Sequence, residues 1–270
     1  MVADSATPHP TAFGGHLLPQ GEKGYLRGMD LSPDILAWRA DLLRPPGALN
    51  TLARATQQRV NRIIPEKVHA AITAAIEGMT RAMLVGSDFT TGDPLVGLTL
   101  DERRARAGKA IDGWKAAAAA EGGITGAGGF LAAAADFPLL MSLKIKLLFD
   151  LAAIFGHDGA ALSERLFILH VFELAFSDAA HRAGVLAALD DWDAKPHPAH
   201  LDDFDWRAFQ QQYRDHIDLA KLAQFLPVVG APLGAIVNWR LVERLGRTAV
   251  MAYRMRAEQG AGRPTPQAPT

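Results

Sequence analysis

The sequence has no cysteine among its 270 residues, which excludes disulfides, thiolate nucleophiles and cysteine metal ligands. It also lacks any useful length of strict polar–apolar alternation, the pattern typical of a half-buried strand. A net charge of −1 argues against nucleic acid as a partner for the whole chain. The motifs of nucleotide-binding loops, serine hydrolases and zinc proteases are absent as well. Any function must therefore be sought in helical faces and in scattered polar groups.

The two ends of the chain differ in composition from its middle. The first residues, "MVADSATPHPTAFGGHLLPQGEKG", contain no basic stretch followed by an apolar one, so we expect no signal peptide and a cytoplasmic location. The last residues, "EQGAGRPTPQAPT", are rich in proline, glycine, alanine and threonine. We expect disordered tails at 1–30 and 259–270 around one domain at 31–258.

Helix signals occur along the whole of that central region. Ser32, Pro33 and Asp34 give an N-cap, a proline at the first helical position and an acid in the first turn. Thr99 and Glu102 have the spacing of a capping box, and Ser163 is placed to cap a further helix. The sequence predicts a single all-α multi-helix bundle of roughly eight to ten helices.

The most apolar stretch is "GGITGAGGFLAAAADFPLLMSLKIKLLFDLAAIFG" at 122–156. A membrane-spanning helix needs ~20 consecutive apolar residues, but here Asp136 ends the first uncharged run. We expect Gly122 and Gly123 to end the preceding helix, and Asp136 to cap a helix over 137–155 that follows a glycine-rich one at 123–135. A core helix, an interfacial hairpin and a full span all remain open, and the length rule favours the first two.

A similar phrase, "FLPVVGAPLGAIVNWRLVERLG", begins at Phe225. Again a short run of small residues ends at a polar residue, an aromatic residue follows, and a long helix is predicted after it. We interpret the two segments as a pseudo-repeat whose glycines, Gly126 and Gly230 above all, let the segments pack closely. The polar residues of this pseudo-repeat are Asp136, Asn238 and Lys144.

Four phrases together resemble the EcsC family of bacterial proteins: "RIIPEKVHAAIT" at 62–73, "ADFPLLMSLKIKLLFDLA" at 135–152, "RDHIDLAKL" at 214–222 and "PVVGAPLGAIVNWRLVERLG" at 227–246. The resemblance covers about 35–258. The family takes its name from a protein encoded beside two ABC-transporter components. The resemblance implies a helical bacterial protein with a connection to a membrane or a transporter, and it supplies neither a reaction nor catalytic residues.

Several histidines and acids fall on predicted helices. His170 and Glu173 share one helix face, His181 follows on the next helix, and His216 and Asp218 lie in "RDHIDL". Such side chains can assemble a metal site in a helical bundle, and the metal could activate water for hydrolysis. The usual di-metal signature needs Glu-x-x-His twice, however, and this chain has one His-x-x-Glu. A buried histidine bonded to a glutamate is the commoner outcome, so no cofactor or metal is expected.

Two helix faces are basic. One carries Arg54, Arg59 and Arg62 with no acid between Pro46 and Ile64. The other, on the last helix, carries arginines within about 40° of one line. Each arginine near an anionic membrane contributes ~1 kcal/mol, and an apolar segment alongside strengthens the attachment. The residues of this second face are Arg240, Arg244, Arg247 and Arg254.

These observations favour a non-enzymatic accessory or binding protein attached peripherally to the cytoplasmic membrane face. Its expected partners are an anionic membrane surface and a membrane protein, with a link to a transport system. Two alternatives stay open. One is a helical metal-dependent hydrolase using His170, Glu173, His181 and His216, and the other is a soluble bundle that binds a small apolar ligand.

Overall fold

The computed structural model describes residues 31–44, 78, 92–127, 129–177, 179–197 and 230–261. Within these ranges, residues 124–127, 129–140, 179–180 and 230–234 are described as backbone only. All of the described residues belong to one unit of the chain, Leu31–Thr270.

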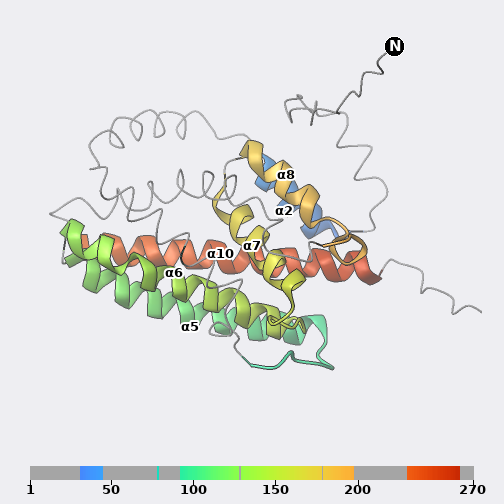
Figure 1. The fold of residues 1–270 in the computed structure, drawn as a ribbon, viewed down its shortest axis with the longest axis horizontal. Coiled ribbons are helices and arrows are strands. Elements are labelled where there is room, and N and C mark those ends of the chain that lie inside the picture. Colours follow the sequence, from blue (N-terminus) through green and yellow to red (C-terminus); the bar gives the residue numbers. More distant parts are fainter. Residues whose placement is uncertain are drawn as a thin grey trace, which may run out of the picture. The chain divides into compact units, whose positions relative to one another are not determined.

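The described part of the chain contains helices and turns and no strand, which confirms the all-α prediction. Six α-helices and one short 3-10 helix are present in these ranges (Figure 1). They are α2 (Pro33–Leu43), α5 (Leu100–Ala127), α6 (Gly129–Ile154), α7 (Leu162–Phe176), α8 (Ala179–Leu189), η3 (Trp192–Ala194) and α10 (Gly230–Ala261).

The helix starts follow the sequence signals in two of three cases. At α5 the capping box is confirmed, because the Thr99 backbone N–H and hydroxyl both donate to Glu102 Oε2 at 2.8 Å. At α2, Ser32 is the N-cap and Pro33 the first helical residue, but the Ser32 hydroxyl makes no cap bond. It donates instead to Glu258 Oε1 of α10 at 2.9 Å. The third prediction was wrong, since α7 begins at Leu162, one residue before Ser163.

The apolar stretch at 122–156 is divided at a different point from the one predicted. Gly122 and Gly123 lie inside α5, and Asp136 lies inside α6 rather than at its start. Alanine has the highest helix propensity of any residue, and alanine runs flank these glycines on both sides. The helix-forming tendency of these runs outweighs the ~1 kcal/mol cost of each glycine. Pro138 is also inside α6, where it removes one backbone hydrogen bond.

The pseudo-repeat is not shown by the structure. Asn238, like Asp136, lies inside a helix, so the prediction that each residue begins a long helix was wrong. The structure describes only the backbone at Gly126, Gly230 and Asp136, so the predicted packing of the two segments lies outside what it describes. Among the described residues, no helix is both long enough and apolar enough to cross a bilayer.

Helix α10 organises the packing, and α5 is its most extensive partner (Figure 1). The two helices are antiparallel, because Ile111 of α5 meets Gly246 while Lys115, one turn later, lies over Trp239. A Cβ atom on Gly246 would approach Ile111 Cγ1 to 2.6 Å, so this crossing depends on glycine.

Helix α7 forms the centre of the core. Every residue from Leu166 to Phe176 except His170 is buried, so the helix is covered on all sides. It packs against α10, α8 and α6. The loop at the start of α7 and the end of α10 therefore come together next to the core, and this is where the polar groups gather.

Candidate functional site

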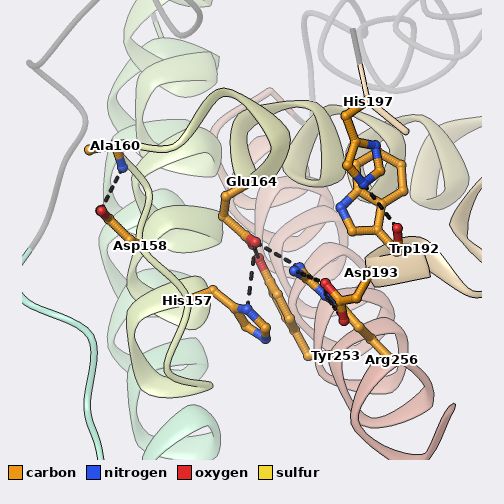
Figure 2. Close-up of polar contacts among 9 residues, drawn as sticks. All are labelled: His157, Asp158, Ala160, Glu164, Trp192, Asp193, His197, Tyr253 and Arg256. Atoms are coloured by element: carbon orange, nitrogen blue, oxygen red, sulfur yellow. Dashed lines mark hydrogen bonds and ion pairs between the residues drawn. The ribbon is translucent and has the colours of Figure 1, made fainter. Parts of the chain in front are cut away.

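A partly buried polar network centres on Glu164, in the first turn of α7 (Figure 2). The Tyr253 hydroxyl donates to Glu164 Oε1 at 2.5 Å, and Arg256 Nη1 donates to Glu164 Oε2 at 2.6 Å. The same guanidinium binds Asp193 of η3 through Nη2 at 2.6 Å and through Nε at 3.0 Å. His157 Nδ1 lies 3.7 Å from Glu164 Oε2. Three separate segments are thus joined by one arginine.

The positions of these groups follow from the helix periodicity. Tyr253 and Arg256 are three residues apart on α10, so both side chains lie on the side of the helix that faces α7. His157 follows Gly156, whose φ of +88° ends α6 in a conformation that suits glycine. Aromatic rings close the network: the imidazole of His157 stacks on Tyr253, and the Arg256 guanidinium lies 4.7 Å from the centre of the Phe167 ring.

Burial and the carboxylates set the protonation of the network. Burial raises the pKa of Tyr253 well above its usual value, and the neighbouring Glu164 adds to this, so the phenol stays a hydrogen-bond donor. Burial lowers the pKa of His157, which keeps its imidazole neutral at pH 7. Burial alone would lower the pKa of Arg256, but its bonds to Asp193 and Glu164 raise it overall.

This network is better suited to holding the fold together than to chemistry. Both oxygens of Glu164 accept hydrogen bonds from groups that remain protonated, so the carboxylate is not poised to take a proton from a substrate. All three nitrogens of the Arg256 guanidinium likewise donate to carboxylates, those of Glu164 and Asp193. We therefore assign the Glu164 network a structural role, in which it joins the end of α10 to α7 and η3.

A second network joins α2 to α8 and α10. Arg39 binds Asp190 through both terminal nitrogens, at 2.5 and 2.9 Å, and both side chains are buried. Arg254 Nη2 donates to Asp34 Oδ2 at 2.9 Å and lies 3.7 Å from Glu258. The first described helix is thereby attached to the last one through charged groups.

The histidine and glutamate residues predicted on α7 and α8 do come together. Glu173 Oε2 lies 3.2 Å from His170 Nδ1, and Glu173 Oε1 is hydrogen-bonded to His181 Nε2. Burial alone would raise the pKa of Glu173, but the hydrogen bonds to His170 and His181 outweigh it and lower the pKa to about 2. The carboxylate of the buried Glu173 is thus ionised and shared between two half-buried imidazoles.

The described residues contain no group of three or more ligating side chains arranged to hold a metal ion. His216 and Asp218, the other residues proposed for a metal or catalytic site, lie outside the described residues. The three residues that do meet are hydrogen-bonded to one another through the Glu173 carboxylate.

The most exposed apolar groups of the described helices lie in the N-terminal half of α10. Ile236 is 49% exposed and Trp239 is 42% exposed. Arg240, Arg244 and Arg247 are exposed on the same side of the helix. Partial burial of the Arg244 guanidinium and the charge of Arg182 lower the pKa of Arg244 to about 10, so it remains charged at neutral pH. We call these five residues the α10 basic face.

Arg254 was expected in the same group, and this was wrong. It is only 6% exposed, because α2 covers this end of the helix and Asp34 pairs with the guanidinium. The other basic segment, with Arg54, Arg59 and Arg62, lies outside the described residues. Of the pseudo-repeat residues, Lys144 and Asn238 are both buried, and the Asn238 amide nitrogen has no hydrogen-bond partner among the residues that the structure describes.

The sequence did not point to Glu164, Asp193, Tyr253 or Arg256. An acid in the first turn of a helix and a tyrosine with an arginine three residues later are ordinary surface patterns. The only signal was that Tyr253 and Arg256 share a helix side with the apolar residues Leu245 and Ala249, which indicates that the arginine is buried.

Comparison with known proteins places the whole described region in one family. The EcsC protein family matches residues 32–257. Protein EcsC of Bacillus subtilis (strain 168) is 40% identical over 227 residues, which cover 84% of this chain and 94% of that protein. A second Bacillus subtilis protein, named Uncharacterized protein YdbA, is 32% identical over 144 residues, 52% of each chain. No solved structure matches significantly. The chain therefore belongs to the EcsC family.

Proposed function

We propose that this protein is a non-enzymatic accessory protein that attaches to the cytoplasmic face of a membrane through the α10 basic face. The observation that carries the proposal is the combination, on one side of α10, of two exposed apolar side chains with three exposed arginines. This is the pattern of a helix that lies in the interface, with its apolar residues toward the acyl chains and its basic residues at the phosphates.

The composition of the face agrees with that role. Tryptophan is favoured at the headgroup level, where its ring is partly apolar and its N–H finds polar partners. Each of the three arginines contributes ~1 kcal/mol near an anionic surface, so together they favour binding by ~3 kcal/mol, or roughly 100-fold in the partition coefficient. An isoleucine and a tryptophan add an apolar contribution that salt does not screen.

The buried networks support the non-enzymatic part of the proposal. In the Glu164 network and in the Glu173 cluster, both oxygens of the central carboxylate are bonded to arginine, tyrosine or histidine. Of the residues named for a metal-dependent hydrolase, His170, Glu173 and His181 do meet, but they do not form a group that could hold a metal ion. The alternative of an apolar ligand binder gains no supporting observation among the described residues. A membrane protein partner and a link to a transport system rest on the family resemblance alone.

Co-sedimentation with vesicles tests the proposal. Wild-type protein should pellet with vesicles that contain anionic lipid at low salt and remain in the supernatant with neutral vesicles. Changing Arg240, Arg244 and Arg247 together to glutamate should release the protein, because attraction becomes repulsion. Arg104, Arg106 and Lys109 are exposed on α5, and their change to glutamate alters the net charge equally, so this triple variant is the matched control. Equal loss of binding in both variants would contradict the proposal.

A further inference from the structure

One acidic residue lies within the α10 basic face. Between Ile236 and Arg247, Glu243 is the only carboxylate of the helix. Its Oε1 accepts a hydrogen bond from Arg247 Nη2 at 3.1 Å. The same atom lies 3.9 Å from Lys115 Nζ of α5. Glu243 therefore offsets part of the positive charge that the arginines give to this face.

Lys115 connects this acid to the apolar part of the face. Its ammonium group lies 4.7 Å from the centre of the Trp239 ring and 2.8 Å from Asp112 of α5. The side chain of Lys115 is about nine-tenths buried, whereas that of Arg247 is three-quarters exposed. Glu243 thus lies between a buried cation next to the tryptophan and an exposed cation at the surface.

We propose that Glu243 sets the density of anionic lipid that the α10 basic face requires for binding; this inference rests on the function proposed above. Away from a membrane, Glu243 holds Arg247 in an internal ion pair. At an anionic surface the carboxylate is repelled by the phosphates that attract its neighbours. Binding therefore requires a surface whose attraction for the arginines exceeds its repulsion of Glu243. Its phosphates must also replace Glu243 as the partner of Arg247. Sparse anionic lipid does not meet this condition, and dense anionic lipid does.

The strength of the pair makes such an exchange feasible. An exposed i,i+4 ion pair is weak and is readily screened by salt, so lipid phosphates can compete for Arg247. Lys115 keeps Asp112 as a partner when Glu243 is neutralised, so the packing beneath Trp239 is retained. A purely structural role for Glu243 would predict a small change in helix stability and no change in lipid preference.

The test compares Glu243→Gln with Asp101→Asn. Asp101 is a strongly exposed acid in the first turn of α5, so its replacement changes the net charge by the same amount away from the α10 basic face. Binding is measured with neutral vesicles that contain increasing fractions of phosphatidylserine at low salt. The expected result is that Glu243→Gln increases the partition coefficient about fivefold, which corresponds to one elementary charge near the surface. Half-maximal binding should also move to a lower phosphatidylserine fraction.

Three outcomes are informative. Equal curves for Glu243→Gln and Asp101→Asn, with wild-type protein still bound by anionic vesicles, would overturn this inference and leave the proposed function standing. Failure of wild-type protein and of Glu243→Gln to bind at any phosphatidylserine fraction would overturn both. Binding by Glu243→Gln at fractions where wild-type protein stays in solution would support the inference.

Discussion

The hydrogen bonds at Glu173 predict a specific dependence of stability on pH. The carboxylate has an ordinary pKa of 4.5 and a pKa of about 2 in the folded protein. Because the folded-state pKa is lower than the unfolded one, this group stabilises the fold at pH values above 4.5. The contribution is lost as pH falls toward 2, where the folded carboxylate also binds a proton. A difference of about 2.5 pKa units corresponds to about 3 kcal/mol in the free energy of unfolding.

Glu173→Gln removes the charge and keeps a side chain of nearly the same shape. Near pH 7 the variant should lose about 3 kcal/mol of unfolding free energy relative to wild-type protein. At pH 2.5 most of this difference should have disappeared. For a domain whose total stability is typically 5–15 kcal/mol, the loss at neutral pH is large enough to be measured directly.

Urea unfolding followed by far-UV circular dichroism, repeated at pH steps from 7 to 2.5, measures the difference. Other carboxylates also titrate in this range, so the informative quantity is wild-type minus variant at each pH. Asp101→Asn removes an exposed carboxylate and is the control for general charge effects. A difference between wild-type protein and Glu173→Gln that stays constant from pH 7 to 2.5 would refute the assignment of the two histidine bonds.

Two further predictions concern packing around α10. Tyr253→Phe removes the hydroxyl that donates to Glu164. We expect the free energy of unfolding, measured in urea, to fall by ~1.5–3 kcal/mol, because the acceptor is a buried carboxylate. A loss under ~0.5 kcal/mol would show that the bond contributes little. Gly246→Ala should destabilise the fold by ~1–2 kcal/mol, since the new Cβ overlaps Ile111 and overpacking outweighs the gain in helix propensity. Gly108→Ala on α5 meets nothing within 4 Å and should stabilise the fold by ~0.5–1 kcal/mol, so equal effects at the two glycines would contradict the close approach of α5 and α10.

Features that depend on neighbouring residues in the chain could be predicted from the sequence. The capping box of Thr99 and Glu102 is a contact over three residues, and it is present as expected. The pairing of His170 with Glu173 is equally local, and His181 lies in the first turn of the helix that follows directly. The helical class follows from the same short-range signals repeated along the chain.

Features that depend on tertiary contacts could not be predicted. Glu164 and Arg256 are 92 residues apart, and the sequence around either residue does not indicate that the other is its partner. The line of arginines on the last helix gives the direction of each side chain but not what covers it, so Arg254 was placed at the surface although Asp34 binds it. The position of the break between α5 and α6 depends on whether an alanine-rich helix can include its glycines, and here it does.

The bond between Asp34 and Arg254 joins residues 220 positions apart, and Ser32 and Glu258 are tied in the same way. During synthesis at ~5–20 residues per second, α2 leaves the ribosome roughly 11–44 s before its partners on α10 exist. Asp34 must stay hydrated throughout that interval, whereas Arg39 of α2 gains its partner Asp190, 151 positions away, earlier. Contacts of such long sequence separation also raise the contact order and slow the final closure of the domain. The last turns of α10 therefore control when folding can be completed, and a chain arrested before Arg254 would leave Ser32 and Asp34 without their partners, although Arg39 of α2 would already have Asp190.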